Sequence, residues 1–185
     1  MVITQMTMKF ARKPHLLAPA LLLLSTFASG QILEQPTISL GDALVHPLEE
    51  TSLPVQLSGV EGEAVLHLEL KIQFPAVPLR FVRVERDESQ NSLSVHTSLE
   101  SDAQDPEPMA TLLLEVDSVE SLPEGELLQL IFEATDEIYE NEERIIKIVE
   151  ASLRTADGEQ IEELNLNNGK VMILIPLFSC FFYMH

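Results

Sequence analysis

Residues 65–74 read VLHLELKIQF, and apolar and polar side chains alternate along this stretch. The apolar set is Leu66, Leu68, Leu70, Ile72 and Phe74, and the polar set between them is His67, Glu69, Lys71 and Gln73. Successive side chains of a β-strand point to opposite faces of its sheet, so this alternation predicts a strand with one buried and one solvent-facing side. Pro75 and Pro78 are expected to end it.

Eight further segments have the composition of short strands and are separated by polar, turn-prone stretches. They are residues 37–46, 51–58, 79–86, 92–98, 110–117, 126–135, 144–154 and 170–175. About nine strands without a long helix predict an all-β fold, namely an antiparallel β-sandwich or jelly roll. A helical turn within residues 136–150 is the one alternative that the pattern leaves open.

The first 30 residues differ in composition from the rest of the chain. They contain a positively charged start, an apolar run and a small-residue cleavage site, which are Lys9, Arg12 and Lys13, residues 16–28, and Ala28, Ser29 and Gly30. This order is typical of a secretory signal peptide, so we expect a secreted, extracellular or cell-surface protein. A membrane anchor is the alternative, but the apolar run is shorter than the roughly 18–20 residues of a spanning helix.

The remaining chain is predicted to form one β-sandwich domain over residues 31–175, followed by an apolar tail at 176–185. The tail is too short for a firm membrane span, and whether it is native or an anchor stays open. All 30 acidic residues and eight of the eleven basic ones lie beyond residue 30, which gives this part a net charge of −22. Such a charge repels nucleic acid, and the single Cys180 permits no internal disulfide.

No catalytic or metal-binding motif is present, so we expect neither an enzyme nor a cofactor. The chain lacks a G-x-S-x-G elbow, an H-E-x-x-H helix and a glycine-rich phosphate loop. No two of its five histidines have the spacing of zinc ligands. The acids of TADGEQIEEL (155–164), which are Asp157, Glu159, Glu162 and Glu163, lack the ligand ladder of a calcium loop. Asp157 and Gly158 are instead predicted to form the turn of a hairpin.

A carbohydrate-binding module is an alternative function, because such modules stack sugar rings on exposed aromatic side chains. The chain has no Trp. Between the predicted signal peptide and the tail, its aromatic residues are Phe74, Phe81, Phe132 and Tyr139. We expect Phe74 and Phe132 in the core, so a sugar platform requires Tyr139, Phe81 or the tail aromatics in a row on one face.

The order of several motifs along residues 37–175 resembles that of the cohesin domain. The segments that carry the resemblance are ISLGDALV (38–45), TSLPVQLSGVEG (51–62), LPEGELLQLIFEA (122–134) and IVEASLRTADGEQIEELNLNNGKVMI (148–173). Within them, the family's glycine-led strand corresponds to Gly125, Leu127, Leu130 and Phe132, and its closing hairpin to Asp157–Gly158 and Gly169–Lys170–Val171. The segment QFPAVP (73–78) departs from the family, in which an aspartate and a proline often follow the long strand.

The resemblance implies a nine-stranded jelly-roll sandwich that binds a dockerin-like module on one sheet face, in assemblies linked to polysaccharide degradation. That face includes the long alternating strand and a neighbouring strand. The implied partner-binding residues are His67, Glu69, Lys71, Gln73, Thr111, Leu113 and Glu115. The simpler alternative is that these residues form only the solvated side of a sheet, and a structural surface domain without a specific ligand is equally compatible with the sequence.

Overall fold

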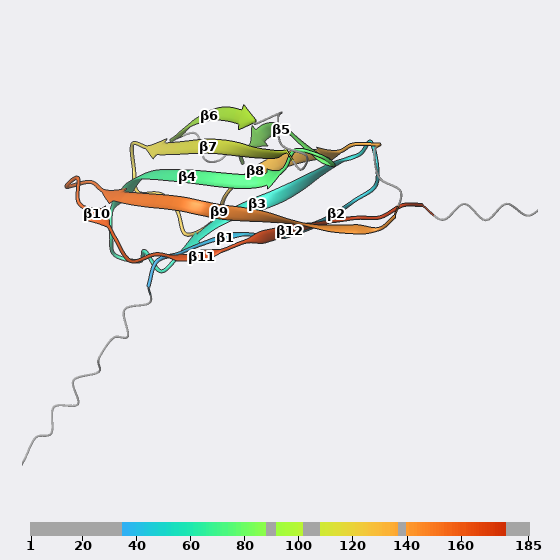
Figure 1. The fold of residues 1–185 in the computed structure, drawn as a ribbon. Helices are drawn as coiled ribbons and strands as arrows, with labels where there is room; N and C mark the ends of the chain where they lie inside the picture. Colours follow the sequence, from blue (N-terminus) through green and yellow to red (C-terminus); the bar gives the residue numbers. More distant parts are fainter. Residues whose placement is uncertain (1–34, 88–91, 102–107, 137–139, 177–185) are drawn as a thin grey trace, which may run out of the picture. The chain divides into compact units, whose positions relative to one another are not determined.

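The computed structural model describes residues 35–87, 92–101, 108–136 and 140–176, and their regular secondary structure is entirely β (Figure 1). The strands are β1 (Thr37–Leu40), β2 (Asp42–Val45), β3 (Glu50–Ser58), β4 (Val65–Pro75), β5 (Leu79–Glu85), β6 (Leu93–Ser101), β7 (Met109–Ser118), β8 (Gly125–Ala134), β9 (Glu142–Thr155), β10 (Gln160–Ile161), β11 (Asn165–Asn167) and β12 (Gly169–Ile173). None of the described residues belongs to a helix that could cross a membrane.

The strands form two sheets. The five-stranded sheet has the order β11-β1-β3-β8-β5, and the seven-stranded sheet has the order β2-β12-β9-β4-β7-β6, with β10 paired to β9. Pairing is antiparallel except between β1 and β11 and between β2 and β12. The predicted all-β sandwich is therefore confirmed, with twelve strands instead of nine.

Two causes explain the three additional strands. The segment 37–46 is divided at Gly41, where the chain passes from the five-stranded to the seven-stranded sheet. The Gly41 amide donates a hydrogen bond to the Pro54 carbonyl at 2.9 Å, and a Cβ at residue 41 would lie 2.5 Å from Pro54 Cγ, so only glycine fits this crossing. Strands β10 and β11 are too short and polar for periodicity to predict them.

The core fills the space between the sheets and includes the inner side of β4. Phe74 and Phe132 are 1% and 0% exposed, which confirms their predicted burial, and their rings meet edge to face with centroids 5.0 Å apart. The predicted alternation holds from Leu68 to Phe74 but is wrong at its start: Val65 is buried and Leu66 is only half-buried. A β-bulge in the pairing with β9 between Val65 and His67 shifts the phase there.

The predicted turn at Asp157–Gly158 is confirmed. The amide of Gly158 donates to the carbonyl of Thr155 at 3.0 Å, and Gly158 has a φ of 80°, which favours glycine. The turn joins β9 to the short β10, and the chain then visits the five-stranded sheet as β11 before β12 pairs with β9. The closing hairpin is thus interrupted by β10 and β11.

Some predictions fall on residues outside the described ranges and stay predictions. These are the signal peptide, Tyr139, the single Cys180 and the apolar tail from residue 177 onward. The structure answers the alternative of a helical turn within residues 136–150 only in part. Residues from Glu142 onward form strand β9, and residues 137–139 are not described.

Candidate functional site

The outward side chains of β9, β4, β7 and β6 form a continuous grid, which we call the outer face. Strand register aligns them in four rows, because directly paired residues of antiparallel strands lie on the same side of a sheet. The rows are Ser94–Asp117–His67–Arg154, His96–Glu115–Glu69–Ser152, Ser98–Leu113–Lys71–Glu150 and Glu100–Thr111–Gln73–Lys147.

The structure brings all seven predicted site residues together on this face. Three of the four on β4 pair directly with the three on β7: Glu69 with Glu115, Lys71 with Leu113, and Gln73 with Thr111. The fourth, His67, pairs with Asp117, which the sequence reasoning had not singled out. The Nδ1 atom of His67 lies 2.7 Å from Oδ1 of Asp117, so this pair is hydrogen-bonded at the end of the face.

The remaining charged side chains of the outer face have no ion-pair partner among the described residues. They are Glu69, Lys71, Glu100, Glu115, Lys147, Glu150 and Arg154. Two of them, Glu69 and Glu115, are exposed acids directly opposite one another, an arrangement that destabilises a sheet when no cation screens it. These charged side chains are therefore available to interact with solvent or with a partner molecule.

Two depressions lie in the face, one in its two central rows and one at its fourth row. One of about 220 Å³ is lined by Glu69, Lys71, Leu113, Glu150 and Ser152. Its Ser152 hydroxyl makes no hydrogen bond within the described part of the chain. The other, of about 390 Å³, is lined by Gln73, Glu100, Ser101, Met109 and Thr111. Five of the seven predicted residues thus line hollows that protruding side chains of another molecule can enter.

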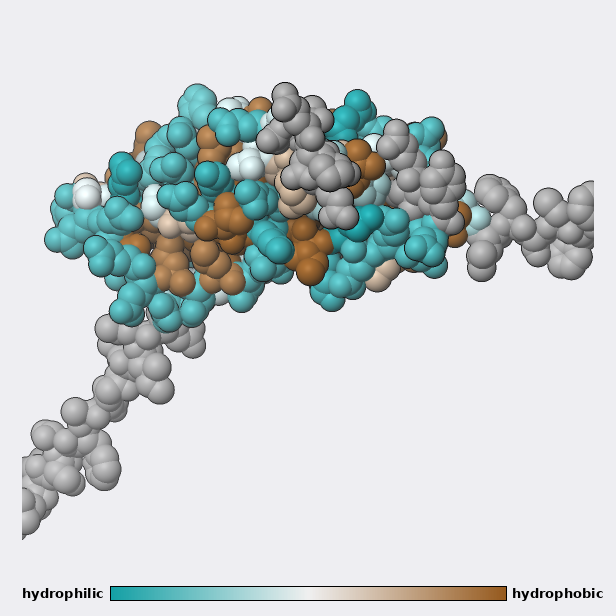
Figure 2. Space-filling model, viewed as in Figure 1, coloured by the Kyte–Doolittle hydropathy of each residue, from teal (hydrophilic) through white to brown (hydrophobic). Residues whose placement is uncertain are grey.

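Sequence reasoning missed the contributions of β9 and β6 to the face. Strand β9 is hard to interpret because a bulge in its pairing with β4 leaves Val149 outside the ladder and 43% exposed, which breaks the alternation. Strand β6 is an edge strand whose neighbour cannot be deduced from one sequence. An apolar patch of Ile145 on β9, Met172 on β12 and Leu44 on β2 continues the same side of the sheet. In Figure 2, brown patches likewise interrupt a mostly teal surface.

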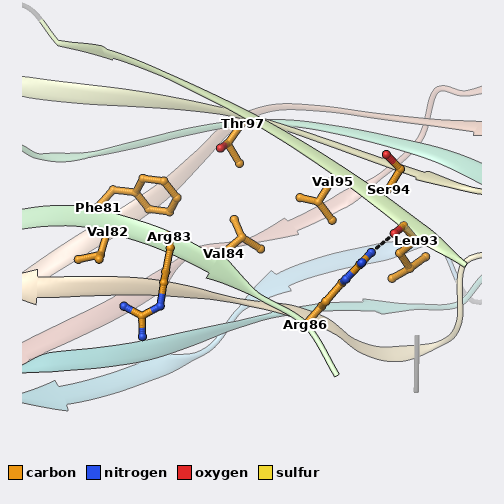
Figure 3. A pocket seen from close by; sticks show the side chains of 9 residues that line it. All are labelled: Phe81, Val82, Arg83, Val84, Arg86, Leu93, Ser94, Val95 and Thr97. Carbon is orange, nitrogen blue, oxygen red and sulfur yellow. Dashed lines mark hydrogen bonds between the residues drawn. The ribbon is translucent and has the colours of Figure 1, made fainter. Parts of the chain in front are cut away.

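The aromatic residues do not form a sugar-binding platform in the described part of the chain. Phe81 packs its ring against Phe132 with centroids 5.9 Å apart, so Phe74, Phe132 and Phe81 form one internal cluster. Phe81 also borders a cleft of about 640 Å³ between β5 and β6 (Figure 3). The described ranges also contain no group of three His, Cys, Asp or Glu side chains that could bind a metal ion.

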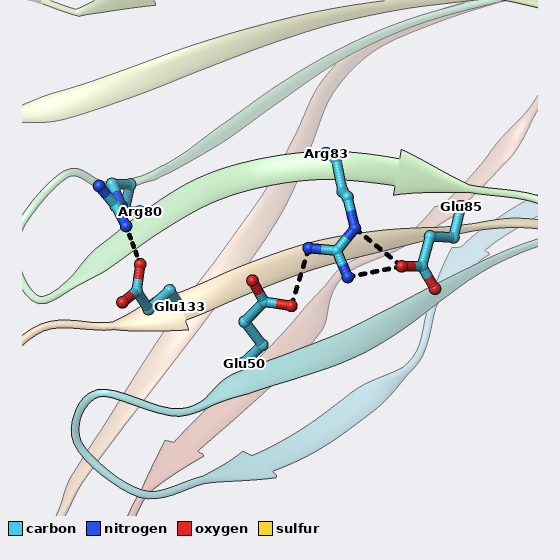
Figure 4. A network of polar contacts seen from close by, with 5 residues as sticks. All are labelled: Glu50, Arg80, Arg83, Glu85 and Glu133. Atoms are coloured by element: carbon cyan, nitrogen blue, oxygen red, sulfur yellow. Dashed lines mark hydrogen bonds and ion pairs between the residues drawn. The ribbon is translucent and has the colours of Figure 1, made fainter.

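The opposite surface of the sandwich, formed by the five-stranded sheet, has its charges paired (Figure 4). Arg83 donates hydrogen bonds to Glu50 at 2.8 Å and to Glu85, and Arg80 pairs with Glu133. The hydrogen bonds to Glu50 and then Glu85 raise the pKa of Arg83 above its ordinary value. Every charged side chain of this network has an ion-pair partner, whereas seven charged side chains of the outer face have none among the described residues.

Comparison with known proteins finds similarity in structure but not in sequence. No protein-family model matches the chain, and no curated protein matches it. A non-cellulosomal cohesin from the hyperthermophilic archaeon Archaeoglobus fulgidus superposes with a TM-score of 0.55 at 15% identity, covering 76% of this chain and 91% of that one.

Two further solved structures give the same result. A type I cohesin–dockerin complex from Clostridium thermocellum matches with a TM-score of 0.57 at 16% identity, over 76% of this chain and 99% of that chain. The cohesin module of a family 33 glycoside hydrolase from Clostridium perfringens matches with a TM-score of 0.56 at 18% identity, over 77% and 97%. At these identities the similarity concerns architecture, and on that basis the described domain of this protein has the cohesin fold.

Proposed function

We propose that this protein is a secreted, non-enzymatic module that binds a dockerin-like protein through the outer face of its seven-stranded sheet. The observation that carries the proposal is the set of charges on that face without an ion-pair partner among the described residues, around a central depression, on a fold shared with cohesins solved in complex with dockerins. Because the other outer surface pairs its own charges, the seven-stranded sheet is the better candidate for binding.

The chemistry of the face defines the partner. Five acids and three cations lie in its four rows, and the acids Glu69, Glu115 and Glu150 lie close to its centre. A partner that presents Lys or Arg side chains to these acids, around an apolar group placed over Leu113, supplies the missing counter-charges. Charged contacts of this kind chiefly set the association rate and the choice of partner, while the apolar contact at the centre acts mainly on the dissociation rate.

The experiment measures binding of a panel of calcium-loaded dockerin modules by calorimetry. The test variant combines Glu69→Lys with Glu115→Lys, and the matched control combines Glu162→Lys with Glu163→Lys, two exposed acids outside the four rows. We expect the test variant to weaken binding at least tenfold, which corresponds to about 1.4 kcal/mol, and the control to bind as the wild type does. Equal binding by both variants, or no binding of any dockerin by the wild type, contradicts the proposal.

The proposed location is extracellular, and a role beside polysaccharide-degrading enzymes is the biological setting we propose. Support comes from the signal-peptide pattern of residues 1–30 and from the family 33 glycoside hydrolase that carries one of the similar cohesin modules. Mass spectrometry of the protein recovered from culture medium or cell surface should find a chain that starts near residue 31. Recovery of the uncleaved chain from the cytoplasm alone contradicts secretion.

A further inference from the structure

The two sheets have four edge strands, and β6 differs from the other three. In the described part of the chain, β11 has three residues and β2 has four, so both offer short edges. Strand β5 carries three charged residues and a bulge between Phe81 and Arg83. Short length, charge and bulges are the features that keep sheet edges from pairing with other chains.

Strand β6 is neither short nor bulged, and it carries little charge. It spans nine residues, Leu93–Ser101, contains no proline, lysine or arginine, and pairs with β7 without a bulge. Glu100 is its one charged residue when the histidine is neutral. A long, regular and nearly uncharged edge exposes a row of backbone donors and acceptors that another strand can pair with.

The inner side of β6 is also incompletely covered. Thr97 and Leu99 pair with the buried Leu114 and Leu112, so they point toward the sandwich interior, yet both are exposed and Leu99 reaches 50%. Beside them lies the cleft between β5 and β6, into which Phe81 and Val84 point from one side and Val95 and Thr97 from the other (Figure 3). A strand added outside β6 places alternate side chains over this opening.

We propose that two copies of this protein pair through β6, antiparallel and about a two-fold axis at Thr97. In this register Val95 of one copy lies opposite Leu99 of the other, so the exposed Leu99 gains an apolar neighbour. No charges oppose one another in this register: each Glu100 lies opposite the neutral Ser94 and diagonal to His96 of the other copy, so the two acids are kept apart. A single strand pair lies at the low end of interface sizes, so the dimer is weak and reversible.

The two-fold axis gives a geometric test by cysteine cross-linking. In a Cys180→Ser background, Thr97→Cys places the two new cysteines directly opposite one another. Their Cα atoms then lie about 5 Å apart, a distance that a disulfide can span. The matched control Ser94→Cys is on the same exposed strand, but its two copies lie about 20 Å apart in this register. We expect Thr97→Cys to form covalent dimers at least tenfold faster than Ser94→Cys under mild oxidation.

Sedimentation of the purified protein at increasing concentration supplies the second readout. Physiological or higher ionic strength is required, because two chains that each carry a net charge of −19 repel one another. We expect a monomer–dimer equilibrium that Thr97→Lys abolishes, since it places two like charges at the axis while changing an exposed side chain. A strictly monomeric wild type, a dimer that Thr97→Lys leaves intact, or equal cross-linking of the two cysteine variants overturns the proposal.

Discussion

Each sheet contains a pair of glutamates directly opposite one another on neighbouring strands, but the two pairs have different surroundings. In the five-stranded sheet Glu50 lies opposite Glu133, and in the seven-stranded sheet Glu69 lies opposite Glu115. Arg83 pairs with Glu50 and Arg80 with Glu133, whereas no cation among the described residues pairs with Glu69 or Glu115. Opposed carboxylates are thus neutralised on one surface and left unneutralised on the other.

The difference indicates which surface has its charged side chains paired within the chain. A sheet surface that only needs solubility can pair its charges internally, as the five-stranded sheet does. Leaving two acids opposed costs stability, roughly 0.2–1 kcal/mol for a cross-strand pair. On the seven-stranded sheet the opposed acids are Glu69 and Glu115, and Glu69 lines the central depression. Cations of a bound partner would remove the repulsion between them.

The largest expected effect comes from the core that supports both surfaces. Phe132 is fully buried and its ring contacts Phe74 on the other sheet and Phe81 on its own. Phe132→Ala should lower the free energy of unfolding by about 3–5 kcal/mol, as measured by chemical denaturation. Variants on either surface should change it far less, and a surface variant with a Phe132-sized effect would mean that the two surfaces are not independent of the core.

Removing the cations should affect only the five-stranded sheet. Arg80→Gln combined with Arg83→Gln leaves Glu50 opposite Glu133 without a counter-charge, so the melting temperature should fall at low salt and recover at high salt. The matched double variant Lys71→Gln and Arg154→Gln removes two cations that have no ion-pair partner in the described part of the chain. Thermal unfolding of this control should show a smaller change, and an equal decrease in both would contradict the comparison.

Much of this architecture follows from the sequence, and the limits have physical causes. The alternation from Leu68 to Phe74 depends on one strand's own pattern, so it predicted both the buried side and the outward set on β4. The bulges at Val65 and Val149, the sheet change at Gly41 and the short β10 and β11 depend on pairing between distant segments. For the same reason the sequence predicted β4 and β7 as part of the site but not the residues of β9 and β6, nor that Glu69 and Glu115 form no ion pair with a described residue.

The same substitution should have opposite signs on the two sheets. Glu115→Gln removes the repulsion with Glu69 and should raise the free energy of unfolding by about 0.2–1 kcal/mol. Glu133→Gln removes the partner of Arg80 and should lower the free energy of unfolding. Denaturant titrations of the two single variants at low salt measure the difference, and two changes of the same sign would show that local charge pairing does not distinguish the surfaces.

The smallest expected change in stability gives the most direct test of why the acids are unpaired. His96 lies opposite Glu115 on the exposed edge strand, so His96→Arg introduces the kind of cation that the five-stranded sheet already has beside its own glutamates. An exposed pair of this type contributes at most about 1 kcal/mol, so stability should rise only slightly. Binding of a dockerin-like partner should weaken at the same time, because Glu115 then has a cation within its own chain; His96→Gln, which adds no charge, is the control. If His96→Arg raises stability and leaves partner binding unchanged, then the unpaired acids are not used for recognition, and the outer face binds through its depressions and Leu113 instead.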